Sequence, residues 1–464
     1  MEQNEFLLYD HQKQIRLQAE QVSFYLQGQI IEAFCEKNEV YYLLFYKTNF
    51  LTAFKPTRLR RNSYIERAFK KGQVYPADFP FIHELLSSNN PCQVVNFEQL
   101  LRQLKKIYTP QEKALILTFL ESFIPKKQLF NEILAEFYEH RRNGQMLLGY
   151  QIIRILMDFA PKHSLIKQQA SDRSFNKHAF SYDNNCSDVM EKDSIYAEKV
   201  LYSQKEQEES YRQLVVRYQS ESRWLDLMVL SIYQLKLSFS ELHYASLKQL
   251  LEKHFDETKI IQVLEQLFFQ LPNFLPLQKE LFHFYIKTQD IEKLCNLLDS
   301  NSFQLSSSQV KKISDILEGL DFEKHLLAPD VVRLLVKSVL DIYPEKTEKL
   351  LSKCIIWLLS NHEPAYIKNW LQAFRENPGA RKIYSEVETM EKLNDDLDHM
   401  QILGQLYFQY KQFEKAIECF SWEMELEPNN PKPLQWLSKV YREKGMAEES
   451  DMYRQLCISI QKQA

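Results

Sequence analysis

The chain has 464 residues, a net charge of −4 and only eight glycines. Ordinary usage of about 7% glycine would give roughly four times as many, and phosphate-binding loops and tight hairpins depend on that residue. The composition therefore argues against nucleotide-binding folds, and neither the dinucleotide-binding nor the P-loop glycine motif occurs. With 45% apolar residues the chain can bury a core, and we predict an all-α fold.

The N-terminus reads MEQNEFLLYD, which lacks the basic and apolar regions of a secretory signal. Apolar runs such as YYLLFY (41–46) and CIIWLL (354–359) are far shorter than the ~20 residues that a membrane span needs. The seven cysteines are scattered and form no CxxC pair, which is typical of reduced thiols. We therefore expect a cytoplasmic protein without a membrane span.

The first 90 residues combine helix and strand signals. The segments VYYLLFY (40–46) and FLTAF (50–54) are rich in strand-favouring aromatic residues, and EKNE (36–39) suits a hairpin turn. Other apolar residues recur at helical spacing. They are Ile15, Ala19, Val22, Leu26, Ile30 and Phe34. We favour helices for this segment, with a small α+β element as the alternative.

Residues 55–72 read KPTRLRRNSYIERAFKKG and contain one acid, Glu66, among many cations. Tyr64 and Phe69 are interleaved with the charges, and a cationic surface with aromatic stacking residues can bind RNA or DNA. The same pattern also suits a solvated helix face. The cations are Lys55, Arg58, Arg60, Arg61, Arg67, Lys70 and Lys71.

From residue 91 onward the pattern predicts one helix after another. Residues 91–164 read as helix hairpins and residues 197–396 as degenerate helical repeats, with prolines such as Pro329 at helix starts. Between them, residues 165–196 lose the periodicity and are rich in polar and turn-forming residues. We predict a linker or loop there, and a domain boundary.

Residues 397–464 contain two units offset by 34 residues. In the first, Gly404 and Ala416 are small, as two closely packed helices require, and larger apolar residues surround them. The key positions are Leu403, Gly404, Tyr407, Ala416, Phe420 and Pro428, followed by Leu437, Ser438, Tyr441, Gly445 and Ser450. This spacing resembles the tetratricopeptide repeat (TPR) family. Glu423 and Arg454 depart from the family pattern.

Two upstream segments match the same spacing only in part. Any antiparallel helix hairpin yields such matches, so we claim the resemblance only for residues 397–464. One partial match is Leu281, Tyr285, Leu294 and Leu298; the other, with two extra residues in the turn, is Leu134, Ala135, Tyr138, Gly149, Ile153 and Pro161.

The resemblance implies a right-handed stack of hairpins whose first helices line a concave groove for a partner segment. Three of the groove positions are cations, which favours a partner with acidic side chains or a free C-terminal carboxylate. The glutamines Gln401 and Gln405 do not match the carboxylate clamp of the chaperone-binding members. The groove positions are Asp398, Gln401, Gln405 and Phe408, then Lys432, Gln435, Lys439 and Arg442.

No sequence motif indicates catalysis, a cofactor or a metal site. The histidines form no HExxH or HxH pair and no cluster with the cysteines. Catalytic residues, cofactors and metals are therefore predicted as none. We expect a non-enzymatic scaffold or adaptor that binds a protein or peptide segment in the repeat groove. The alternative is an RNA- or DNA-associated factor that uses the basic stretch at 55–71.

Overall fold

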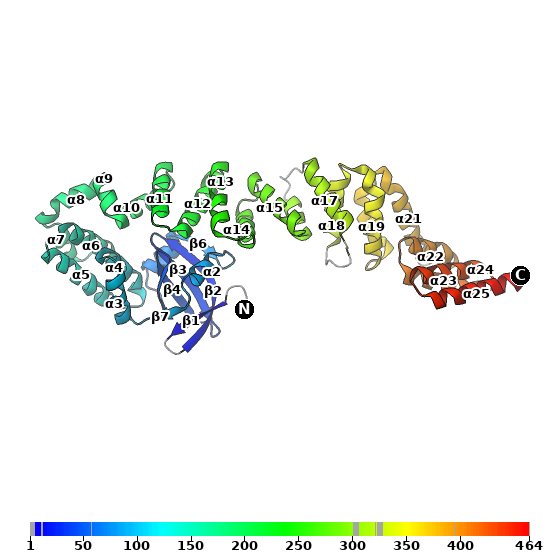
Figure 1. Cartoon of the computed structure of the whole chain (residues 1–464), viewed down its shortest axis with the longest axis horizontal. Helices are drawn as coiled ribbons and strands as arrows, with labels where there is room; N and C mark the ends of the chain where they lie inside the picture. Colours follow the sequence, from blue (N-terminus) through cyan, green and yellow to red (C-terminus); the bar gives the residue numbers. More distant parts are fainter. Residues whose placement is uncertain are drawn as a thin grey trace. The chain divides into compact units, whose positions relative to one another are not determined.

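The structure is a computed structural model that describes residues 5–10, 13–56, 58–299, 306–320, 322, 328–394 and 396–463. Helices account for most of these residues, and a seven-stranded sheet forms the N-terminal part (Figure 1). The chain divides into two units, Met1–Pro276 and Leu277–Ala464. The predicted all-α class is therefore right for most of the chain and wrong for the N-terminal sheet.

The strands of the first unit are β1 (Glu5–Asp10), β2 (Lys13–Tyr25), β3 (Gly28–Cys35), β4 (Val40–Tyr46), β5 (Asn49–Phe54), β6 (Gln73–Pro76) and β7 (Cys92–Val94). They form one sheet in the order β5-β4-β3-β2-β1-β7, with β6 paired to the second half of β2. Neighbours are antiparallel except β1 and β7, which are parallel. The Thr52 hydroxyl donates to the Val95 carbonyl (3.0 Å), so the two ends of the sheet approach each other.

The helix favoured for residues 15–34 is wrong, because these residues form β2, β3 and the turn between them. A bulge just after Ala19 shifts the register of β2 against β3. Leu17 and Ala19 are buried before the bulge, and Val22 and Phe24 after it. The bulge turns the two-residue alternation of a strand into a three-residue step, which resembles helical spacing in the sequence.

In the first unit, the helices α1 and α2 lie between strands in the sequence, and the helices α3–α14 come after the last strand. They are α1 (Tyr64–Lys71), α2 (Phe81–Ser87), α3 (Phe97–Ile107), α4 (Pro110–Phe119), η1 (Leu120–Ser122), α5 (Lys126–Arg142), α6 (Met146–Phe159), α7 (Ser164–Ala170), η2 (Arg173–Phe175), α8 (Asn176–Asp183), α9 (Ser187–Lys192), α10 (Ser194–Ser203), α11 (Glu208–Ser220), α12 (Trp224–Ser238), α13 (Glu241–His254) and α14 (Glu257–Gln270). One apolar core joins the sheet to α1 and to α3–α9.

Residues 165–196, predicted as a linker, are mostly helical and belong to this unit, whose limit lies at Pro276 instead. Phe175 and Tyr182 anchor the segment in the core. The Tyr182 hydroxyl also donates to Asp193 (2.6 Å). Helices this short depend on tertiary contacts for stability, so a few buried side chains hold them without a regular apolar stripe.

A buried ion network attaches α10 and α12 to the sheet. The Arg223 guanidinium, 2% exposed, donates to Glu198 through both Nη atoms (2.6 and 3.0 Å) and to Asp226 through Nε (2.9 Å). From the sheet side, Gln27 donates to Glu198 (2.7 Å) and Gln29 to Asp226 (2.8 Å). Burial raises the pKa of Asp226. Buried charges are stable only when they are paired and hydrogen-bonded, and the two glutamines complete that requirement.

The second unit is helical in its described part. Its elements are α15 (Leu275–Thr288), α16 (Ile291–Asp299), α17 (Ser307–Gly319), α18 (Pro329–Leu340), η4 (Pro344–Lys346), α19 (Thr347–Leu359), α20 (Pro364–Leu371), η5 (Gln372–Phe374), η6 (Pro378–Ala380), α21 (Arg381–Leu393), η7 (Leu397–His399), α22 (Met400–Gln409), α23 (Phe413–Leu426), α24 (Pro431–Glu443) and α25 (Ala447–Gln463). Proline opens α18, α20 and α24, since its missing N–H costs nothing in a first turn.

Helix hairpins in both units share one turn geometry. A residue with positive φ follows the first helix, and the next N–H donates to the carbonyl five residues earlier, as in a Schellman motif. The positive-φ residues are Gly144, Asn185, Ser222, Gln289, Lys411 and Gly445. The matching bonds are Gln145 to His140, Cys186 to Ser181, Arg223 to Tyr218, Asp290 to Tyr285, Gln412 to Tyr407 and Met446 to Tyr441, all 2.9–3.0 Å.

The last four helices form two hairpins, α22–α23 and α24–α25. A Cβ on Gly404 would lie 2.7 Å from the Phe420 ring, so the close contact predicted at Gly404 is present. At the equivalent positions of the second hairpin, the Ser438 hydroxyl donates to the Ser450 carbonyl (2.9 Å) and the Ser450 hydroxyl to the Ser438 carbonyl (2.8 Å). The close contact is therefore between Gly404 and Phe420 in the first hairpin and between Ser438 and Ser450 in the second.

Candidate functional site

The predicted cations of the second hairpin lie on one exposed face of α24. Lys432, Gln435, Lys439 and Arg442 follow helical spacing and are all exposed. None of the three cations forms an ion pair with a described residue, whereas Lys444 of the same hairpin pairs with Glu414 (2.9 Å). We call these four residues the α24 face. Its three cations form no ion pair with a described residue.

The α22 positions of the predicted groove are less open. Asp398 is exposed in η7, but Gln401, Gln405 and Phe408 are half-buried. The Phe408 ring packs edge-on against Trp436, with centroids 5.5 Å apart, and therefore contributes to packing between the hairpins.

Trp436 joins the two hairpins and supports the α24 face. Its ring stacks on Phe420 with centroids 5.6 Å apart, and the Lys439 ammonium lies 4.3 Å from its centroid. A cation held over an indole has a restricted position. The equivalents of Phe408 and Phe420 in the second hairpin are Arg442 and Arg454, both exposed. The second hairpin therefore lacks the aromatic pair with which the first one packs against its neighbour.

The basic stretch is partly neutralised by acids. Lys55 pairs with Glu39 (2.7 Å), Arg67 with Glu121 (3.7 Å) and Lys70 with Glu66 (2.7 Å). The remaining cations of this stretch are exposed and form no ion pair with a described residue. They are Arg58, Arg60, Arg61 and Lys71.

Of the two aromatic residues between these charges, Tyr64 is buried and Phe69 is half-buried. Tyr64 is 3% exposed and stacks on Phe119 with centroids 3.9 Å apart, and its hydroxyl donates to the Tyr25 carbonyl (2.7 Å). Phe69 packs against Tyr42 (centroids 6.2 Å apart). The basic stretch therefore offers charge, and Tyr64 is not accessible for stacking on a base.

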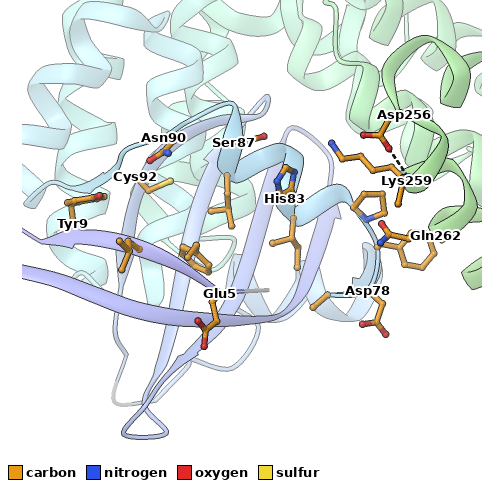
Figure 2. A pocket seen from close by; sticks show the side chains of 18 residues that line it. Glu5, Tyr9, Asp78, His83, Ser87, Asn90, Cys92, Asp256, Lys259 and Gln262 are labelled. Atoms are coloured by element: carbon orange, nitrogen blue, oxygen red, sulfur yellow. Dashed lines mark hydrogen bonds between the residues drawn. The ribbon is translucent and has the colours of Figure 1, made fainter. Parts of the chain in front are cut away.

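The first unit contains a cleft, which we call the sheet cleft and which no sequence motif predicted. Its volume is about 640 Å³, within the range of roughly 300–1,000 Å³ that ligand sites occupy. It is formed by β1, the segment from Ala77 through α2 to Cys92, and the start of α14 (Figure 2). The apolar lining residues are Phe6, Leu7, Ala77, Phe79, Pro80, Ile82 and Leu86.

Polar side chains from three elements surround this apolar surface (Figure 2). Glu5, Asp78 and Asp256 supply carboxylates, and none of them forms an ion pair with a described residue. The ammonium of Lys259 lies 2.6 Å from Glu84 of α2, so its charge is neutralised. The other polar lining residues are Tyr9, His83, Ser87, Asn90, Cys92, Thr258 and Gln262.

Cys92 is the lining residue with the chemistry of a nucleophile, but its environment suppresses that role. The thiol is 3% exposed, and burial raises its pKa to about 11. A reactive cysteine requires its thiolate near neutral pH. Cys92 is therefore a packed, protonated side chain.

In the described part of the chain, no group of three or more His, Cys, Asp or Glu side chains is arranged to hold a metal ion. Within the same residues, no helix has the length and apolar character needed to cross a bilayer. No known family model matches the chain, and no curated protein is significantly similar to it.

Proposed function

We propose that this protein is a non-enzymatic scaffold whose C-terminal hairpins bind an acidic segment of a partner protein. The observation that carries the proposal is the α24 face, where Lys432, Lys439 and Arg442 have no acidic partner among the described residues. Elsewhere in the second unit, Lys346 and Lys349 share Glu318, and Lys368 lies between Glu388 and Glu391. Unneutralised charge on one rigid face favours an external acid.

The proposed architecture is a TPR-like array in which α22 and α24 are the first helices of consecutive units. The 34-residue offset relates Gly404 to Ser438, and it also relates the turn residues Lys411 and Gly445, which both have positive φ (58° and 79°). In such arrays the exposed faces of the first helices bind extended or helical segments. Gln401, Gln405 and Gln435 would then hydrogen-bond the partner, and the cations of α24 would pair with its carboxylates.

A charge-reversal experiment tests this proposal. The probe is a fluorescein-labelled peptide of alternating glutamate and leucine with a free C-terminal carboxylate, and the readout is fluorescence anisotropy. Reversal of three exposed cations, K432E/K439E/R442E, should weaken binding by roughly 10- to 50-fold, since each exposed ion pair contributes up to about 1 kcal/mol. Equal binding by wild type and variant would contradict the proposal.

The matched control reverses three cations in the first unit, R58E/R60E/R61E. It changes the net charge by the same amount, so a general charge effect would weaken peptide binding in both variants. A specific α24 site leaves the control at wild-type affinity.

The second candidate function is association with RNA or DNA through the basic stretch. It rests on Arg58, Arg60 and Arg61, which are exposed and form no ion pair with a described residue. Because Tyr64 is buried and Phe69 is half-buried, binding would depend mainly on phosphate contacts and would fall steeply with salt. The same two variants test it: a labelled poly(U) 20-mer should lose affinity with R58E/R60E/R61E and keep it with K432E/K439E/R442E.

A further inference from the structure

We infer that the sheet cleft is a second binding site, which takes a polypeptide segment of a partner that presents a lysine or arginine beside apolar side chains. This site lies in the first unit and selects the opposite charge from the α24 face. Binding at the two sites can therefore be tested independently, and a negative result at one leaves the other standing.

The cleft has the capacity and the apolar surface for more than one side chain. Its volume is about 640 Å³, and β1 and α2 each contribute apolar residues to its walls, among them Leu7, Ile82 and Leu86. Burial of apolar surface supplies most of the affinity at such sites, while a few placed polar groups supply selectivity.

The charge of the lining selects a cation. Glu5 comes from β1, Asp78 from the connection between β6 and α2, and Asp256 from the N-cap of α14 (Figure 2). Asp256 accepts a hydrogen bond from the backbone N–H of Lys259 (2.9 Å). The helix N-terminus offsets part of its charge, but Glu5 and Asp78 have no such compensation among the described residues.

The lining residues that could oppose this charge are already engaged. The Lys259 ammonium is bound to Glu84. His83 Nδ1 lies 3.7 Å from the same Glu84 carboxylate. The cleft therefore presents a net negative lining to an incoming segment.

The backbone of β1 is fully paired on one side and partly paired on the other. β1 is hydrogen-bonded to β2 over Glu5–Asp10 and to β7 only over Leu8–Asp10. Selectivity for the occupant therefore comes from the side chains that line the cleft, with a basic side chain near the carboxylates and apolar neighbours against β1 and α2.

The test selects a phage-displayed library of random 12-residue peptides on the wild-type protein and measures synthetic copies of the selected peptides by anisotropy. We expect enriched sequences with lysine or arginine beside leucine, isoleucine or phenylalanine. The variant D78N/D256N should weaken their binding by about tenfold. Asparagine keeps the N-cap of α14, so this variant should retain the wild-type circular dichroism spectrum.

The control variant E98Q/D188N removes two exposed acids of the same unit outside the cleft, and it should bind like wild type. The inference is overturned if enriched peptides lack basic residues, if no peptide is enriched, or if D78N/D256N and the control bind equally. Hexylammonium is tested in parallel by NMR. If it shifts cleft resonances while no selected peptide does, the site takes small cations and the polypeptide assignment fails.

Discussion

The two units hold their helix hairpins in place by different means. In the first unit, Arg223 sits between Glu198 and Asp226 and joins α10 and α12 to the sheet. In the C-terminal hairpins, contact depends on side-chain size, since Gly404 lies directly against Phe420. Charge pairing fails when one partner is removed, and close packing fails when one atom is added. The units should therefore respond to opposite kinds of substitution.

The largest effect is expected from Arg223→Leu. The substitution leaves the carboxylates of Glu198 and Asp226 buried without their cation, and removal of one partner from a buried pair costs about 3–5 kcal/mol. Urea unfolding followed by tryptophan fluorescence, with Trp224 as a reporter on α12, should show this loss. Arg212→Leu is the control, because Arg212 pairs with Glu208 at the surface (3.0 Å) and such pairs contribute less than about 1 kcal/mol.

A loss below about 1 kcal/mol for Arg223→Leu would mean that water or a rearranged side chain compensates the two acids. The buried charges would then not be what holds α10 and α12 on the sheet.

The next effect concerns a buried lysine of the same unit and the pH dependence of its stability. Lys205 is 9% exposed, its ammonium lies 3.8 Å from the Tyr202 ring centroid and 4.5 Å from that of Tyr233, and burial lowers its pKa to about 8. An unfolded lysine titrates near 10.4, so between pH 8 and about 10.4 the unfolded state binds more protons. Stability should therefore rise with pH in that window, by about 3 kcal/mol at most.

The check is the difference in unfolding free energy between wild type and Lys205→Met from pH 7 to pH 10.5. Other groups cancel in that difference, which should grow in favour of wild type as the pH rises. Lys192→Met removes an exposed lysine, so its unfolding free energy should depend on pH as that of wild type does. The same pH dependence for Lys205→Met and wild type would show that Lys205 is solvated.

The sequence predicted most helices of the second unit because proline and capping residues act locally. Pro329 begins a helix as expected, and Pro364 begins another. The 34-residue offset located both C-terminal hairpins. The alternative strands at 40–46 and 50–54 are also present. These signals survive in the sequence because each depends on a few neighbouring residues.

The remaining features depend on contacts between distant segments. The bulge after Ala19 interrupts the alternation of buried and exposed residues along β2, so the sequence pattern does not indicate a strand. The sheet cleft is lined by Glu5, Asp78 and Asp256, and no local pattern links residues so far apart in sequence. A sequence signal for the hairpin turns was nevertheless present. Four of the shared turns have a tyrosine at the same position, namely Tyr218, Tyr285, Tyr407 and Tyr441. This recurring tyrosine would have allowed the turn at Ser222 to be predicted.

The smallest effect is expected at the hairpin crossing. In Gly404→Ala the new methyl group meets the Phe420 ring at 2.7 Å. Overpacking costs about 1–3 kcal/mol, and the helix propensity of alanine returns up to about 1 kcal/mol, so we expect a net loss of about 1 kcal/mol in urea unfolding. Gly319→Ala is the control, because no heavy atom lies within 4 Å of the added Cβ, and it should cause no loss.

A second variant separates crowding from other causes. Phe420→Leu removes the ring that the new methyl group meets, so the double variant G404A/F420L should be more stable than the sum of the single effects predicts, with a coupling of about 0.5–1 kcal/mol. Strict additivity would mean that the backbone of α22 moves to relieve the contact. The crossing would then be adjustable, and the α24 face would not be held in a fixed position relative to α22, which the proposed binding of one segment across both helices requires.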